Sequence, residues 1–308
     1  MDIRWLEDFI TLSEVGSFSK ASALRHSSQP AFSRRIQSLE SWVGSDLIDR
    51  TSYPTKLTPA GALFYEQALS ILTKANEARH MLRHAQTNFI EFAVPHNLSL
   101  NFFPKWLYRM QANIGNIPSR LRAVNVHDGV MMLLEGGCDL LMIYHHPYQP
   151  IELNKNQYHH ICLGYEKFAP YSRSDWQGKP LHCIINKQPQ SPVPFLAYTP
   201  NAYLGRMSHY LLDKQGICLD KCYETDMAEA LKFMTIEGHG TAFLPETAIH
   251  SELEKGILVR ADNVEKGKDL STTLEIRLYK HLSNNHNITH KNQDTLQKIW
   301  GYLSEHYN

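Results

Sequence analysis

The chain has 308 residues, and its 31 lysines and arginines equal its 31 aspartates and glutamates. This length allows two or three domains with large buried cores, and the absence of a basic surplus means that any contact with nucleic acid must be local. No apolar run of about 18 residues occurs and the N-terminus is acidic, so the sequence predicts a cytoplasmic protein with neither a membrane span nor a signal peptide.

Three amphipathic helices are expected at the N-terminus, beginning with Ile3–Glu14. Phe18, Ala21 and Leu24 recur at helical spacing, which puts them on one face of a second helix. The run Ser27-Ser28-Gln29-Pro30 then supplies a helix start. Its serines suit the N-cap position, and its proline falls in the first turn, where the missing N–H costs nothing.

The third helix has an apolar face and a polar, cationic face. The predicted inner residues are Ala31, Phe32, Ile36, Leu39 and either Trp42 or Val43. The predicted outer residues are Gln29, Ser33, Arg34 and Gln37. Arginine, glutamine and serine bind base edges and phosphates, and no acidic residue lies between Val15 and Leu39. The pattern favours a helix-turn-helix; the alternative is an ordinary helical hairpin with a solvated cationic face.

Several short motifs in this stretch resemble a known family. They are SFSKAS at residues 17–22, Ser28-Gln29-Pro30-Ala31, and Leu57-Thr58-Pro59-Ala60-Gly61. With them, the stretch resembles the N-terminal domain of LysR-type transcriptional regulators, which implies a winged helix-turn-helix over residues 1–58. At the wing tip, where the family often has an arginine, this chain has Tyr53-Pro54-Thr55-Lys56. The residues predicted to contact DNA are Ser28, Gln29, Pro30, Ser33, Arg34, Arg35, Arg50 and Lys56.

Thr58-Pro59 marks the start of a long helix over residues 59–86. Small and apolar residues follow steps of four and three along it, which is a heptad seam: Phe64, Ala68, Ile71, Ala75, Ala78, Leu82 and Ala85. We interpret it as a linker and dimerisation helix; the alternative is a core helix of a single globule. Two copies would place two recognition helices on successive major grooves of a pseudo-palindromic operator in double-stranded DNA, and such homodimers are expected to pair into tetramers.

Residues 87–308 alternate between strand and helix patterns. The expected strands are Phe89–Val94, Arg120–Val126, Cys138–Tyr144, Ala197–Tyr198, Leu219–Thr225, Thr241–Leu244 and Leu274–Tyr279. The expected helices include Asp128–Gly136, Ala202–Lys214, Met227–Glu237, Glu246–Glu254 and Gln293–His306. This order predicts a parallel sheet with helices on its faces. Two lobes, residues 87–162 with 270–308 and residues 163–269, resemble the periplasmic-binding-protein-like effector domain of LysR regulators, so the whole chain is expected to be a multidomain α/β protein.

In open α/β sheets, ligands bind at the carboxyl ends of the strands. This rule and the family resemblance predict an effector site in a cleft between the lobes. The predicted residues are His96, Asn97, Ser99, His145, Thr199, Asn201, Tyr203 and Met227. Ser99, Asn201 and Asp226 have an alternative interpretation as helix N-caps.

The stretches His96–Leu100 and Asn201–Met207, which reads NAYLGRM, resemble the hypochlorite-responsive branch of LysR regulators. That resemblance implies oxidant sensing through methionine, a stress response in which a reversible sulfoxide repacks the cleft. The candidates are Met207, Met227 and Met234, whose alternative role is core filling. A small organic, carboxylate-like metabolite is the alternative signal.

The sequence favours a regulator over two other classes of protein. It contains no GxSxG, P-loop or GxGxxG motif, so no enzyme activity and no cofactor are predicted. In the histidine clusters His145-His146 and His159-His160 the residues are adjacent, and adjacent histidines on a strand point to opposite faces and rarely share one metal, so no metal site is predicted. A ligand-binding module without DNA contact is a third possibility, which the helix-turn-helix argues against.

Overall fold

The computed structural model describes residues 2–52, 54–84, 89–151, 153–184, 193–215, 217, 219–262, 269–282 and 290–307, without the side chains of 73, 76–84 and 290–292. The chain divides into two compact units, one built mainly on residues 1–86 and the other on residues 87–133 and 138–308. No helix among these described residues is long and apolar enough to cross a membrane.

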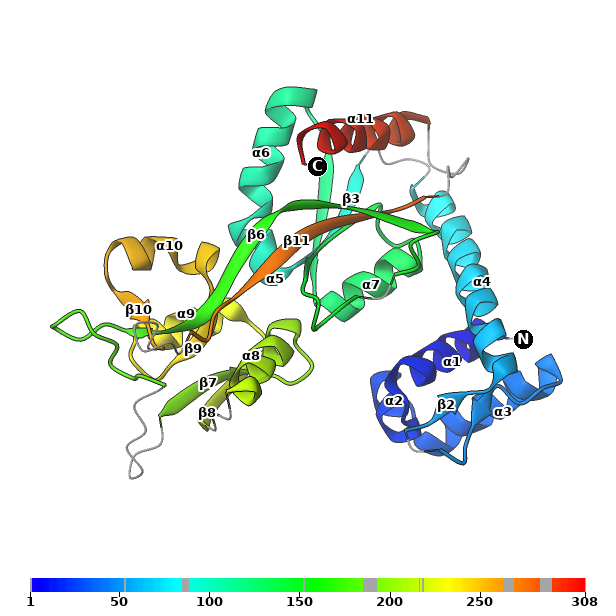
Figure 1. The fold of residues 1–308 in the computed structure, drawn as a ribbon. Coiled ribbons are helices and arrows are strands. Elements are labelled where there is room, and N and C mark those ends of the chain that lie inside the picture. Colours follow the sequence, from blue (N-terminus) through cyan, green and yellow to red (C-terminus); the bar gives the residue numbers. More distant parts are fainter. Residues whose placement is uncertain are drawn as a thin grey trace. The chain divides into compact units, whose positions relative to one another are not determined.

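The first unit is a three-helix bundle followed by a small antiparallel wing and a long helix (Figure 1). Its elements are α1 (Ile3–Val15), α2 (Phe18–Leu24), α3 (Gln29–Val43), β1 (Ile48–Asp49), β2 (Lys56–Leu57) and α4 (Pro59–His84). Gly44 ends α3 in the left-handed conformation, with φ 78°, and its N–H donates to the Glu40 carbonyl. The predicted winged helix-turn-helix is therefore confirmed, with helix bounds within one residue of those expected for α1.

The predicted inner face of α3 is the core of the first unit. Phe32, Ile36 and Leu39 are fully buried, which stabilises the bundle by about 1.5–3 kcal/mol for each side chain. Val43 packs against this core, whereas Trp42 is 55% exposed, which decides between the two alternatives. Leu24 was expected inside but is exposed, because α2 ends at that residue.

The first half of α4 belongs to the core of the first unit. Ala68 and Leu72 are buried, and the Phe64 ring lies 5.6 Å from that of Phe9 in α1. A Cβ at Gly61 would lie 2.0 Å from the Leu47 carbonyl oxygen, so only glycine permits this approach of α4 to the wing. The first half of α4 is therefore a core helix of the first unit, as in the alternative interpretation of this segment. The later seam positions Ala78 and Leu82 have no described side chains, and Ala85 lies outside the described residues.

The second unit contains a seven-stranded sheet in the order β10-β6-β11-β5-β3-β4, with β9 also paired to β6. Its first part has the predicted parallel arrangement, because β3 pairs in parallel with both β4 and β5. The elements of this part are β3 (Ile90–Pro95), α5 (His96–Asn101), α6 (Phe103–Ile114), β4 (Ser119–Val124), α7 (Val126–Leu134) and β5 (Leu140–His145).

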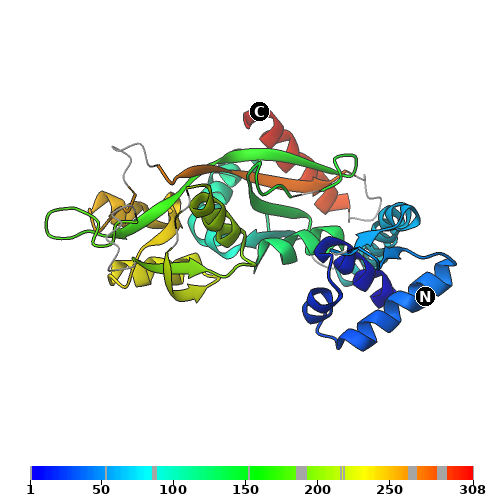
Figure 2. The same cartoon turned by 60° about the horizontal axis from the view of Figure 1, so that its bottom comes forward.

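Two long antiparallel strands, β6 (Tyr158–Arg173) and β11 (Thr272–His281), run through both lobes (Figures 1 and 2). The boundary placed after residue 162 is therefore wrong as a structural break, because it falls inside β6. This strand was not predicted. A β-bulge at Leu163, where the register shifts opposite Ile276 and Arg277, interrupts the alternation of polar and apolar residues that would have revealed it.

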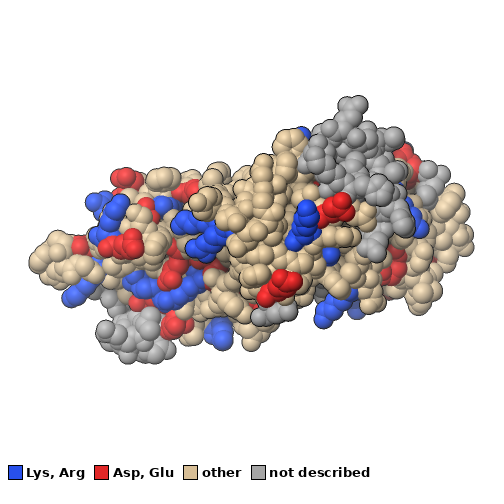
Figure 3. Space-filling model, turned by 90° about the horizontal axis from the view of Figure 1, so that it is seen from above, with Lys and Arg blue, Asp and Glu red and all other residues tan. Residues whose placement is uncertain are grey.

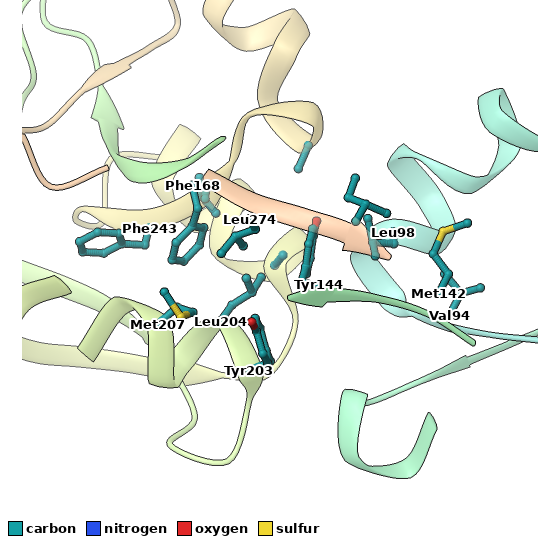
Figure 4. Packing of buried hydrophobic residues seen from close by; sticks show 14 of the residues in the cluster. Val94, Leu98, Met142, Tyr144, Phe168, Tyr203, Leu204, Met207, Phe243 and Leu274 are labelled. Atoms are coloured by element: carbon teal, nitrogen blue, oxygen red, sulfur yellow. The ribbon is translucent and has the colours of Figure 1, made fainter. Parts of the chain in front are cut away.

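The second lobe extends this sheet. Its elements are β7 (Pro194–Tyr198), α8 (Tyr203–Lys214), β8 (Asp220–Thr225), α9 (Ala228–Ile236), β9 (Ala242–Pro245), α10 (Glu246–Glu254) and β10 (Leu258–Arg260), and the last helix is α11 (His290–His306). β7 and β8 are parallel, and backbone hydrogen bonds of 2.9 and 3.0 Å join β7 to Thr241. One apolar core runs through both lobes, from Val94 and Met142 to Met207 and Phe243 (Figure 4).

Candidate functional site

The outer face of α3 presents the predicted base-reading residues. Ser28, Gln29, Pro30 and Arg34 are exposed and Ser33 is half-buried. No carboxylate among the described residues forms an ion pair with Arg34. Elsewhere, on the face shown in Figure 3, acidic and basic side chains are interspersed. A local patch on α3 is therefore the feature that suits a polyanion.

A buried carboxylate pairs with two arginines, one of which was predicted to contact DNA. Asp8 of α1 is only 1% exposed, and it accepts from Nε of Arg25 at 3.1 Å and from Nε of Arg35. Arg35 also donates to Ser27 Oγ at 3.1 Å. Asp8 lies outside the acid-free stretch between Val15 and Leu39, so the local sequence pattern did not reveal these ion pairs. Arg35, predicted to contact DNA, thus holds α1, α2 and α3 together.

Glu40 anchors the wing to α3 in a similar way. Its buried carboxylate accepts from the backbone N–H groups of Leu47 and Ile48, at 3.0 and 3.1 Å, and from Nη2 of Arg50 at 2.6 Å. The guanidinium of Arg50 also lies 5.7 Å from the centre of the Phe18 ring, a cation–π distance. These two contacts hold the half-exposed side chain of Arg50 in place. Lys56 on β2 is exposed.

In the second unit, a chain of hydrogen bonds crosses from one lobe to the other. Nδ2 of Asn97 donates to the Tyr144 hydroxyl at 2.6 Å. Nδ2 of Asn101 donates to Oδ1 of Asn97 at 2.8 Å and to Oε1 of Glu229 at 3.0 Å. Asn97, Asn101 and Tyr144 belong to the first lobe and Glu229 to α9 of the second. We call Asn97, Asn101, Tyr144, Glu166, Tyr198 and Glu229 the junction cluster.

The remaining members of the junction cluster are acidic or phenolic. Glu166 on β6 is 1% exposed and accepts from the backbone N–H of Thr247 at 3.0 Å and from its hydroxyl. Burial raises the pKa of Glu166 to about 7, although the Thr247 hydrogen bonds oppose this. Burial, then the charges of Glu229 and Glu166, raise the pKa of Tyr198 well above its ordinary value.

Two atoms of the junction cluster lack a hydrogen-bond partner. They are the Tyr198 hydroxyl and Oε2 of Glu229, both buried and unpaired within the described part of the chain. Buried polar groups are nearly always paired, since an unpaired one costs about 1–3 kcal/mol. The two atoms therefore mark this junction as more than a packing contact.

The structure brings only some of the predicted effector residues to the junction. Asn97 lies at its centre, and Met227 is 45% exposed two residues before Glu229. His145 does not reach it: adjacent residues on β5 point to opposite faces, so while Tyr144 faces the junction, His145 lies 3.7 Å from Glu275.

The other predicted residues make local contacts. Ser99 donates to the His96 carbonyl at 2.7 Å, His96 is exposed, and the N–H of Thr199 donates to the Thr225 carbonyl at 3.0 Å. The carbonyl of Asn201 accepts from Arg206 at 2.7 Å, and the Tyr203 hydroxyl donates to the Gln149 carbonyl at 3.2 Å. The capping alternative is wrong for Asn201 and Asp226, because Ala202 and Met227 occupy the N-cap positions of α8 and α9.

Sequence reasoning missed most of the junction cluster. Asn97 and Asn101 stand four residues apart, which places them on one face of α5, and this spacing could have identified Asn101. Glu166 lies on the unpredicted strand β6, and Tyr198 and Glu229 carry no motif. These three residues come together only where the two lobes meet in the folded chain.

The three candidate methionines differ in accessibility. Met207 is fully buried beside Leu204 and Phe243 (Figure 4). Met234 is half-buried and packs against the same core, whereas Met227 is exposed. The core-filling alternative therefore fits Met207 and Met234 and does not fit Met227.

Two further features bear on ligands. A pocket of about 580 Å³ opens between α8 and the β7–β8 pair, lined in part by Phe195, Leu212 and Leu219, and none of the eight predicted effector residues is among its lining residues. Within the described ranges, no group of three histidine, cysteine, aspartate or glutamate side chains could hold a metal ion.

An exposed recognition helix on a winged bundle, with a separate two-lobed α/β unit, defines a DNA-binding regulator that carries an effector domain. Residues 3–62 match the family model for bacterial regulatory helix-turn-helix proteins of the lysR family, and residues 86–274 match the LysR substrate binding domain. The chain belongs to the LysR family of transcriptional regulators, which are not enzymes, as predicted.

Individual relatives agree with this assignment. The regulator YjiE of Escherichia coli is 32% identical over 264 residues, which cover 84% of this chain and 83% of YjiE. Full-length HypT from Salmonella typhimurium, described as hypochlorite-specific, is 28% identical with a TM-score of 0.58 over 99% of both chains. Vibrio fischeri DarR in complex with DNA is 28% identical with a TM-score of 0.57 over 98% of both.

Proposed function

We propose that two copies of this chain bind a pseudo-palindromic operator through α3 and the wing, and that a signal received by the second unit controls the binding. The observation that carries the proposal is the exposed row of Ser28, Gln29 and Arg34 on a helix whose inner arginine, Arg35, is held by Asp8. Such a helix is presented rigidly, and its outer residues remain available for base edges and phosphates.

Pairing of the two copies is assigned to α4. Its first half is occupied by the core of the first unit, but Leu63 and Ile71 remain exposed on it. Exposed apolar side chains on a helix of 26 residues support pairing with a second copy. Tetramers formed from two such dimers remain part of the proposal.

The DNA-binding proposal is tested by Arg34→Ala. We expect binding to a cognate promoter fragment to weaken by about 1–3 kcal/mol, because one guanidinium contact to a base or phosphate is lost. Footprinting and affinity measured over a salt series report the change. Arg109→Ala, which removes an exposed guanidinium from α6, is the control and should leave affinity unaltered. An unchanged footprint and affinity for Arg34→Ala would refute the assignment.

The signal proposed for the second unit is an oxidant of the hypochlorite type, sensed by methionine. Similarity to HypT supports it, as does the position of Met207 in the core that joins the lobes. A sulfoxide there would bury a polar S=O group without a partner, which costs about 1–3 kcal/mol and favours repacking. Oxidation of the exposed Met227 carries no such cost.

This difference in burial makes the oxidant proposal testable. After mild hypochlorite, mass spectrometry should detect sulfoxide at Met227 first, and the change in operator affinity should follow the later sulfoxide at Met207 or Met234. Met227→Leu is the matched control and should respond normally, whereas Met207→Leu should respond weakly. A full response in a variant lacking all three methionines would rule out the proposal.

A small organic metabolite bound between the lobes is the second candidate signal. The unpaired polar atoms of the junction cluster favour it, because a buried group without a partner is suited to a ligand. The two signals are compatible, since both would act on the packing between the lobes.

A further inference from the structure

The junction cluster is unusual in its hydrogen-bond inventory. The Tyr198 side chain is 5% exposed, and its hydroxyl has no partner within the described residues. Oε2 of Glu229 is likewise buried and unpaired. Unpaired buried groups lower stability and persist where another function needs them, so both atoms are candidate ligand contacts.

The position of the unpaired carboxylate oxygen is fixed by its neighbours. The other oxygen of Glu229 accepts from Asn101 at 3.0 Å, and Asn101 is itself bonded to Asn97 at 2.8 Å. Asn97 in turn donates to Tyr144 at 2.6 Å. Glu229 is thus positioned by an amide donor at one oxygen, while its other oxygen has no partner within the described residues.

The charged groups around the Tyr198 hydroxyl are all negative. Glu166 and Glu229 are the charged groups that act on the Tyr198 hydroxyl. Within the described part of the chain, neither carboxylate forms an ion pair, and the neighbouring lysines are engaged elsewhere: Lys167 with Glu246 and Lys232 with Glu252. An anionic ligand would be repelled here, and a cationic one would supply the missing counter-charge.

We propose that the junction cluster binds the positively charged nitrogen of a small molecule, a primary ammonium or guanidinium group, with Oε2 of Glu229 and the Tyr198 hydroxyl as acceptors. This inference rests on the proposed role of the second unit as an effector domain, and it replaces the carboxylate-like metabolite that was the alternative signal from the sequence. An ammonium group has three donors and no acceptor, which matches a site that offers unpaired acceptors.

The test compares three four-carbon probes of similar size on the full chain: n-butylammonium, n-butanamide and n-butyrate at the same ionic strength. We expect n-butylammonium to raise the melting temperature and to bind at least tenfold more tightly than the other two in calorimetry. Stronger binding of n-butyrate, or equal binding of all three, would overturn the proposal.

Glu229→Gln separates a ligand contact from a structural one. Glutamine keeps the oxygen that Asn101 uses, so the ligand-free variant should melt no lower than the wild type, while n-butylammonium binding should weaken at least tenfold. Tyr198→Phe should weaken it about threefold or more. Glu254→Gln, a change at an exposed carboxylate of α10, is the control and should bind as the wild type does.

Two results would contradict the role given to Glu229. They are a large loss of stability in the ligand-free Glu229→Gln protein, and unchanged n-butylammonium binding in the same variant. Operator binding without amine is measured in parallel. If the wild type binds its operator but no amine, only the ligand class fails; if it shows no preference for any DNA sequence, the proposed function fails.

Discussion

Two buried carboxylates of the first unit, Asp8 and Glu40, are more completely paired than Glu229 and Glu166 of the junction cluster. In the first unit, Asp8 is shared by Arg25 and Arg35, and Glu40 accepts two backbone N–H groups and Arg50. Within the described residues of the second unit, Glu229 keeps one buried oxygen unpaired, and Glu166 accepts from Thr247 and from backbone at the start of α10.

This difference separates a scaffold from a binding site. A carboxylate with both oxygens paired holds its neighbours in one arrangement, as a rigidly presented recognition helix requires. A carboxylate that is left partly unpaired lowers stability and gains from any group that pairs with it. Three substitutions test whether the fully paired and the partly paired carboxylates contribute differently to stability.

The largest effect is expected for Asp8→Asn. Loss of the buried charge leaves Arg35 without its counter-ion and Arg25 with Glu7 alone, which should lower the opening free energy of α1–α3 by about 3–5 kcal/mol. Amide hydrogen exchange in these helices measures the change within the full chain. Asp2→Asn, which removes an exposed ion pair with Arg4 on the same helix, should exchange like the wild type. Normal protection in Asp8→Asn would show that the pairing does not hold the bundle together.

Glu166→Gln should act in the opposite direction. The pKa of Glu166 is about 7 in the folded chain against an ordinary value of 4.5. Between these values the folded state keeps a proton that the unfolded state has released, so the free energy of unfolding falls as pH rises through this window. The loss amounts to about 3 kcal/mol by pH 8, and the glutamine variant should avoid it.

Urea unfolding at pH 5 and pH 8 checks this expectation. Stability should fall less between these pH values in Glu166→Gln than in the wild type. Some dependence should remain, because burial also raises the pKa of Asp139, to about 6. An identical pH dependence in both proteins would mean that Glu166 is not the group responsible.

The smallest effect is expected for Glu40→Gln. The variant keeps an oxygen for the N–H groups of Leu47 and Ile48 and loses only the charge that pairs with the half-exposed Arg50. The wing should therefore open more easily by about 1–2 kcal/mol. Hydrogen exchange at residues 47–49 reports it, with the α1 amides as internal reference. A loss of opening free energy as large as that of Asp8→Asn would show that the exposure of Arg50 does not determine how much its ion pair contributes.

Local patterns were enough to predict the helical parts of both units. The spacing of Phe32, Ile36 and Leu39 indicated the buried face of α3, and α10 was predicted with the bounds that it has. Patterns failed where a neighbour distant in sequence decides. Asp8 pairs with Arg35 across 27 residues, and the bulge at Leu163 concealed β6.

By itself, the sequence determined the family, the recognition helix and most of the strands and helices in the effector domain, because periodic burial and capping act within a few residues along the chain. Only the tertiary structure decided which arginines are held by carboxylates and which polar atoms remain unpaired where the lobes meet. Pairing depends on distances between side chains that the fold brings together, so Tyr198 and Glu229 carried no signal in the sequence.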